Sequence, residues 1–284
     1  MSFFKKLFFV CLEKTEENEP EITSERNNQN KETNIEFKDS DNNIDIDIDN
    51  DDILLEGNNL KIENESGNLF NENIIIINER GLENKSNKNI GITKFGPKNK
   101  ESINDCILNC NDYIETLFSI IFNKNTKKYS IYSEILSNEF IEYNLFIKVT
   151  KKLKIDKNYY ISFGEIHLTI NRFNNEENIE IIIVYENNEK KSYNYEKSKQ
   201  SVITIGREKN CDIPLTGLNY SRVQCKIFFD DNEYCWFFCD GDGIKESSNG
   251  CWIFLNFDWE INEDIKLRSG LNTFNIKLEN NKMQ

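Results

Sequence analysis

The sequence predicts an all-β protein with two tandem β-sandwiches behind a disordered, acidic and Asn-rich N-terminal segment. Apolar residues alternate with polar ones in short runs, as at Ile203 and Ile205, which is the pattern of strands that bury one face. Turn residues separate these runs, notably at 240–243 and 269–270. No sustained helical periodicity appears between residues 68 and 278, so strands account for the folded part.

Residues 1–67 are expected to be disordered after a short apolar start. Glu, Asn and Asp dominate the segment, and the run NNIDIDIDNDD at 42–52 buries too little apolar surface to offset the entropy of ordering. The apolar start is too short to span a bilayer, and its Cys11 is a candidate acylation site. Five residues can form one face of a short helix that contacts a membrane surface or docks onto a partner: Phe3, Phe4, Leu7, Phe8 and Cys11.

Composition excludes several classes of function. A net charge of −14 argues against general binding to nucleic acid or anionic membranes, because phosphate backbones require clustered Lys and Arg, so any anion site must be local. The eight cysteines lack the paired spacing of zinc sites, and no secretory signal is present. We therefore expect buried free thiols in an intracellular protein, cytoplasmic or nuclear. With a single histidine, His167, and no catalytic constellation, we expect no enzyme activity, no metal and no cofactor.

A weak repeat relates residues 68–173 to residues 174–284, with a shift of about 106 to 110 positions that retains the period-2 apolar pattern. In this repeat, Leu153 falls on Trp259 and Gly164 on Gly270. Each segment is therefore expected to form one sandwich of the same kind.

The chemistry is concentrated between residues 203 and 252, in three loops that separate expected strands. A guanidinium has a permanent charge and a planar fork of donors, which suits a phosphate, and a serine hydroxyl adds a compact donor. An Asn amide offers both a donor and an acceptor to an extended backbone, and a following Gly supplies the positive φ of a tight turn. Gathered at one end of a sandwich, these groups predict a small anion site beside a peptide-binding side chain: Gly206-Arg207, Ser221-Arg222 and Ser248-Asn249-Gly250.

Over residues 179–278, these motifs resemble forkhead-associated (FHA) domains, which are β-sandwiches that bind phosphothreonine peptides. The resemblance implies an adaptor role in signalling, with a phosphothreonine-containing protein as the partner and threonine preferred over serine through a pocket for the γ-methyl group. One departure is Gln224, which stands where the family often has a His that supports the loop. By the resemblance, the phosphate would contact Arg207 and Ser221, Arg222 and Ser248 would flank it, Asn249 would hold the peptide backbone, and Gly206 and Gly250 would shape the loops.

The first copy has lost this chemistry. Gly96-Pro97 stands in place of Gly206-Arg207, and Pro97 has neither a side-chain donor nor an amide hydrogen. Ile114-Glu115 replaces Ser221-Arg222, and a carboxylate there repels phosphate. The arrangement resembles tandem FHA proteins with a divergent first copy. The open alternative is a phosphate-independent scaffold that uses both sandwiches, and substitution of Arg207 separates the two, because only phosphate reading should collapse.

Overall fold

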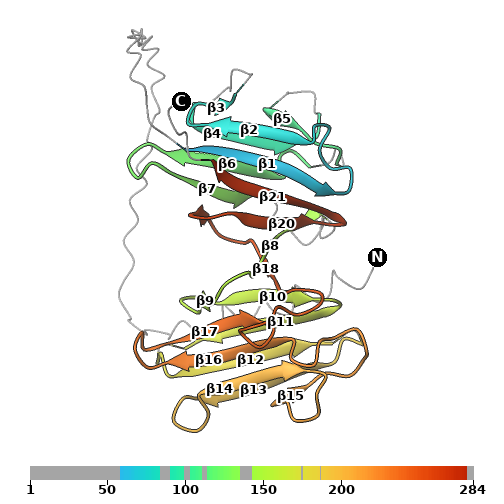
Figure 1. Cartoon of the computed structure of the whole chain (residues 1–284), viewed down its shortest axis with the longest axis vertical. Helices are drawn as coiled ribbons and strands as arrows, with labels where there is room; N and C mark the ends of the chain where they lie inside the picture. The colour runs from blue at the N-terminus through green and yellow to red at the C-terminus, as the bar shows by residue number, and fades with distance from the viewer. Residues whose placement is uncertain are drawn as a thin grey trace, which may run out of the picture.

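The computed structural model describes residues 58–83, 90–98, 103–110, 114–134, 143–173, 175–185 and 187–279. Strands dominate this part of the chain, which contains no α-helix, so the predicted all-β class is confirmed (Figure 1). The predicted disorder of residues 1–57 lies outside the described residues. Its predicted extension to residue 67 is wrong, because Leu60 and Ile62 are buried in an eight-residue strand.

The strands have the following bounds. In chain order they are β1 Asn59–Ser66, β2 Ile74–Asn78, β3 Gly81–Leu82, β4 Ile92–Gly96, β5 Cys106–Ile107, β6 Phe118–Asn123, β7 Lys128–Ser133, β8 Leu145–Lys148, β9 Leu153–Lys154, β10 Tyr159–Phe163, β11 Ile166–Arg172, β12 Asn178–Val184, β13 Lys190–Glu196, β14 Val202–Gly206, β15 Ile213–Pro214, β16 Cys225–Asp230, β17 Cys235–Asp240, β18 Trp252–Phe254, β19 Trp259–Ile261, β20 Ile265–Ser269 and β21 Asn272–Glu279.

These strands form two sandwiches that lie one above the other in Figure 1. The upper sandwich packs β3-β2-β1-β21-β20-β8 against β19-β7-β6-β4-β5, and the lower one packs β13-β12-β11-β10-β18 against β15-β14-β16-β17-β9. Each encloses its own hydrophobic core, the upper around residues such as Phe118 and Phe274 and the lower around residues such as Ile205 and Phe238.

The two sandwiches exchange their last three strands. The strands β19–β21, from the end of the chain, complete the upper sandwich, whereas β9–β11 complete the lower one. Thus Ile276 pairs with Ile62 in the upper half, and Ile170 pairs with Ile181 in the lower half. The two cores therefore do not follow the predicted division into 68–173 and 174–284, because each draws strands from both segments.

Two short crossing strands join the sandwiches. The strands β8 and β18 pair antiparallel, with Phe146 opposite Phe254 and Lys148 opposite Trp252. On its other side β8 pairs with β20, and β18 pairs with β10. Eleven strands therefore form one continuous sheet through both halves.

Each exchanged unit carries side chains suited to the sandwich that it completes. In the lower sandwich Phe163 is fully buried, with its ring centroid 6.4 Å from that of Tyr220, and Ile166 is also buried. The equivalent positions of β20 and β21 are Ser269 and Asn272. In the upper sandwich the Asn272 Oδ1 accepts hydrogen bonds from two backbone N–H groups, those of residues 68 and 69, at 2.9 and 3.1 Å. The side chains of the two three-strand units therefore favour the exchanged arrangement, with β9–β11 in the lower sandwich and β19–β21 in the upper one.

His167 lies on β11, as expected of a strand residue, and gives a pH-dependent stability. Burial, reinforced by the nearby charge of Arg268, lowers the pKa of His167 from 6.5 to about 4. In the unfolded chain this imidazole takes up a proton below pH 6.5, whereas in the folded chain it stays neutral. The free energy of unfolding is therefore expected to fall by roughly 1 to 2 kcal/mol between pH 7 and pH 5 through this group.

Urea denaturation at several pH values measures this effect, with His167→Gln as the matched control. Because the chain has one histidine, the difference between the two proteins isolates it. An identical pH dependence for both proteins would contradict the expectation.

Candidate functional site

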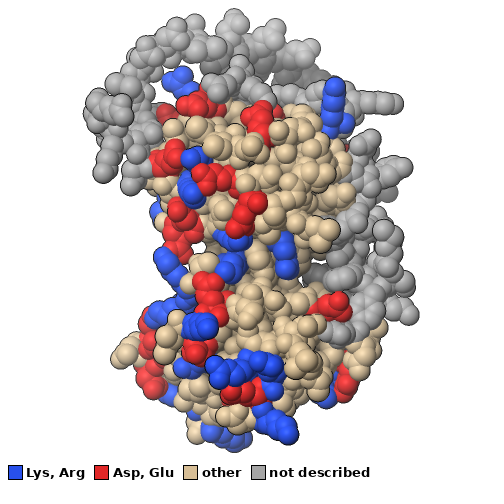
Figure 2. All heavy atoms as spheres, turned by 45° about the vertical axis from the view of Figure 1, so that its right-hand side comes forward, with Lys and Arg blue, Asp and Glu red and all other residues tan. Residues whose placement is uncertain are grey.

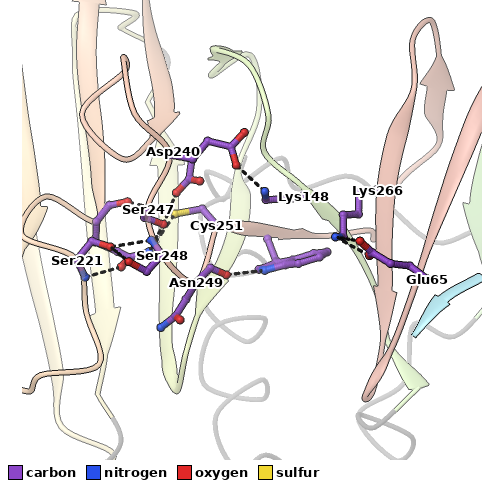
Figure 3. Close-up of polar contacts among 12 residues, drawn as sticks. Glu65, Lys148, Ser221, Asp240, Ser247, Ser248, Asn249, Cys251 and Lys266 are labelled. Atoms are coloured by element: carbon purple, nitrogen blue, oxygen red, sulfur yellow. Dashed lines mark hydrogen bonds and ion pairs between the residues drawn. The ribbon is translucent and has the colours of Figure 1, made fainter. Parts of the chain in front are cut away.

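Three loops at one end of the lower sandwich bring the predicted serines together (Figure 3). The loops follow β14, precede β16 and connect β17 to β18. The Ser221 Oγ accepts a hydrogen bond from the Ser248 backbone N–H at 2.8 Å, and the two hydroxyls lie 3.3 Å apart. The backbone N–H of Arg207 donates to the Ser221 carbonyl at 3.1 Å. Arg207, Ser221 and Ser248 thus come from three separate loops and lie around one point.

Gly206 is required by the close approach of two of these loops. A Cβ atom at this position would lie 2.1 Å from the carbonyl oxygen of Arg222, which is far inside van der Waals contact. Any side chain at 206 would therefore push the Ser221-Arg222 loop away from the strand. The predicted structural role of Gly206 rests on this contact.

The buried Gln224 side chain links two of these loops through hydrogen bonds. Its Oε1 accepts from the Ser221 N–H at 3.1 Å, and its Nε2 donates to the Ser247 Oγ at 2.7 Å. The Ser247 hydroxyl in turn donates to the Asp240 Oδ1 at 2.6 Å. Burial raises the pKa of the Asp240 carboxyl above its ordinary value, while the bond from Ser247 opposes the shift.

Ser247 and Asp240 were not predicted to be part of the site, and Asp240 was assigned to a turn. The only signal for their role was the polarity of two residues beside a strand end and a predicted site. Gln224 was noted only as a departure at the position where the family often has a loop-supporting His, and its side chain contacts residues on both sides, Ser221 and Ser247.

Replacing Gln224 with Leu is expected to destabilise the protein by about 1 to 3 kcal/mol and to weaken ligand binding, because the part-buried Ser221 N–H loses its acceptor and the buried Ser247 oxygen loses the donor Nε2, while Ser247 still donates to Asp240. Thermal unfolding of the full chain measures the first effect. Gln224→His, which keeps a donor and an acceptor, is the matched control and should lose less. Equal stability of the Leu variant and the parent would contradict the role of Gln224.

The two arginines differ in their surroundings. Arg222 is 77% exposed, and its Nε lies 4.0 Å from the Glu208 Oε1. Arg207 is exposed at the end of β14, and no carboxylate of the described residues forms an ion pair with it. Arg207 therefore has no ion-pair partner among the described residues, whereas part of the charge of Arg222 is offset by the nearby Glu208.

Asn249 stands beside the serines on an exposed turn (Figure 3). Its Nδ2 donates to the Asn219 carbonyl at 2.7 Å, which fixes the side chain against the loop before β16. Its own carbonyl accepts from the Trp252 indole at 3.2 Å. The next residue, Gly250, has a φ of 68°, so the predicted positive φ at this turn is confirmed.

In the described parts of two corresponding loops of the upper sandwich, hydrogen bonds of Asn104 join the chain segments. Pro97 is buried, and the Asn104 Nδ2 donates to the Pro97 carbonyl at 3.0 Å and to the Glu115 carbonyl at 2.7 Å. Thr116 donates to the Asn104 Oδ1 at 2.9 Å. The amide of Asn104 thus joins two loops of the upper sandwich without placing a cation between them.

Cysteines do not form a metal site in the described part of the chain, where no group of three or more potential ligands is suitably placed. The described cysteines are free thiols, and six of the seven are buried. Burial raises the pKa of Cys251 well above its ordinary value, so this thiol is poorly suited to bind a metal as a thiolate. In the same described residues, no helix is long and apolar enough to cross a membrane.

The fold and the loop cluster together define a β-sandwich with a polar recognition site. Residues 203–270 match the FHA domain family, so the chain carries an FHA domain. FHA domains are phosphothreonine-peptide binding modules of signalling proteins. The predicted resemblance is confirmed for this segment, and a tandem FHA arrangement stays a prediction, because the match includes none of residues 68–173. Neither the curated proteins nor the solved structures provide a match.

Proposed function

We propose that this protein is a non-enzymatic, intracellular adaptor that binds phosphothreonine peptides through its lower sandwich. Arg207 and Ser221 contact the phosphate, Arg222 and Ser248 flank it, and Asn249 holds the peptide backbone. The observation that carries this proposal is the junction at which Ser221 and Ser248 meet, next to the backbone of Arg207, whose N–H donates to the Ser221 carbonyl at 3.1 Å.

The chemistry of the junction fits a phosphate monoester. The Ser221 hydroxyl can turn its hydrogen from the Ser248 Oγ, 3.3 Å away, toward a bound oxygen without moving its backbone. Arg207 supplies a planar pair of charged donors and has no competing carboxylate among the described residues. Charge-assisted hydrogen bonds of this kind contribute about 1.5 to 3 kcal/mol each.

The charge distribution favours a local anion site over a nucleic-acid surface. Figure 2 shows basic and acidic side chains interspersed over both halves of the visible face. With a net charge of −14, the chain lacks the excess of Lys and Arg that binding along a phosphate backbone requires. A single phosphate on a peptide needs only the few donors of the loop cluster.

The upper sandwich has a different role in this proposal. In the described parts of two of its equivalent loops, Asn104, Pro97 and Thr116 form a hydrogen-bond network without a cation, so its proposed role is that of a structural partner paired with the lower sandwich through β8 and β18, and not of a second phosphate reader.

The test is a titration of the full chain against a degenerate phosphothreonine peptide library, with unphosphorylated and phosphoserine libraries as controls. Binding that requires phosphothreonine supports the proposal and shows the sequence preference. If the three libraries bind equally, or none binds, the phosphate-independent scaffold becomes the better account.

A further inference from the structure

The continuous sheet has an apolar patch on the side that faces away from both cores. On β18, Trp252 and Phe254 alternate with the core residue Ile253, and on β12, Ile182 and Val184 alternate with the core residues Ile181 and Ile183. Residues paired across the antiparallel strands share a face, which places four buried side chains and one partly buried side chain on this outer side. We call them the outer patch: Phe146, Ile182, Val184, Trp252 and Phe254.

Burial of the outer patch is not explained by the cores. The exposed fractions of Ile182, Val184, Trp252 and Phe254 are between 4 and 6%, yet none of these residues belongs to either core cluster. A sheet face open to water leaves large apolar side chains far more exposed. The sheet therefore carries an apolar surface that belongs to neither core and suits an apolar segment.

The patch also contains a half-buried cation, Arg268. The Arg268 guanidinium lies 5.1 Å from the ring centroid of Phe146 and 4.6 Å from that of Trp252. It donates to the Ser162 Oγ at 3.0 Å, and burial lowers its pKa to about 10. No carboxylate in the described part of the chain forms an ion pair with it. A segment that covers this patch would therefore be apolar and would carry an acidic group.

The N-terminal segment has both properties. Its apolar residues recur at helical spacing over positions 3–11, and Glu13, Glu16 and Glu17 follow directly. The remaining chain before β1, residues 18–58, has 41 residues, which as a flexible linker reaches about 32 to 38 Å. From β1 to β18 the sheet advances by four strand spacings, or about 19 Å, so the tether is long enough.

We propose that residues 3–17 dock on the outer patch of their own chain, with the apolar face on Trp252 and its neighbours and the acidic residues toward Arg268. This inference does not depend on phosphopeptide binding. It places the docked segment beside the candidate site, because the Trp252 indole donates to the Asn249 carbonyl and Lys148 pairs with Glu246 at 2.6 Å.

Photo-crosslinking of the full chain tests the docking. With p-benzoylphenylalanine in place of Phe8, irradiation is expected to give crosslinks within one chain to peptides that contain Phe146, Ile182–Val184 or Trp252–Phe254. The same reagent in place of Lys5, on the polar side of the segment, is the matched control and should give few of them. Ile182→Asp should reduce the Phe8 yield at least several-fold.

Two further arms identify other occupants. In a mixture of isotopically heavy and light protein, crosslinks between chains would show docking onto a second copy and would overturn the proposal. With vesicles of phosphatidylcholine and phosphatidylserine present, loss of the crosslinks together with co-sedimentation of the protein would assign the segment to the membrane and overturn it as well. Crosslinks within one chain that are confined to other strands would also overturn the proposal.

Discussion

Residues 174–284 expressed without the rest of the chain are expected not to form the stable sandwich of the full protein. The cut removes β9–β11, which complete the lower sandwich. The only strands in the fragment that can replace them are β19–β21. These would place Ser269 where the fully buried Phe163 lies, and Asn272 where Ile166 lies.

The expected loss of folding free energy is a large fraction of the stability of a typical domain. Replacing a buried Phe with a small residue costs about 3 to 5 kcal/mol, and a buried Asn without partners costs more, against a total stability of about 5 to 15 kcal/mol. Guanidinium denaturation of the fragment and of the full chain measures the difference. Restoring the apolar side chains in the fragment with Ser269→Phe and Asn272→Ile should recover much of it. A fragment as stable as the full chain would show that the exchange is not required.

Replacing Arg207 with Ala is expected to reduce phosphothreonine-peptide affinity about 100-fold, which is the loss of two charge-assisted hydrogen bonds of about 1.5 kcal/mol each. Stability should stay unchanged, because this guanidinium is exposed and has no described ion-pair partner. Arg207→Lys should fall between the two, since an ammonium keeps the charge and loses the planar fork.

Isothermal titration calorimetry with one phosphopeptide measures these affinities. Arg222→Ala is the matched control, since Arg222 is also exposed but already lies near Glu208, and a smaller loss is expected there. Equal losses at the two positions would contradict the assignment of Arg207 as the main phosphate ligand.

Most of the fold could be predicted from the sequence, because many of the strands bury one face and therefore show a period of two. The exchange of strands between the two sandwiches could not be predicted. Both three-strand units have the same apolar pattern, so periodicity does not say which sandwich receives which unit. Only the mismatch between Phe163 and Ser269 carries that information, and its meaning depends on Tyr220 lying opposite. The strand β1 was missed because Leu60 and Ile62 alternate inside an acidic, Asn-rich stretch whose composition is that of disorder.

Part of the candidate site could likewise be predicted from the sequence, and part could not. The polar residues at loop ends could be identified because their chemistry is unusual for strand-flanking positions, and the structure brings Ser221 and Ser248 together. The hydrogen-bond network that supports these loops could not be predicted. Its members, Gln224, Ser247 and Asp240, are separated in sequence and come into contact only when β16 and β17 pair.

The central claim is that the phosphate is read by Arg207. The most direct measurement is a set of four titrations of the full chain and its Arg207→Ala variant, each with the phosphorylated and the unphosphorylated form of one peptide. Phosphorylation is expected to raise the affinity of the parent about 100-fold and that of the variant less than about 10-fold. An equal gain for both proteins would contradict the account.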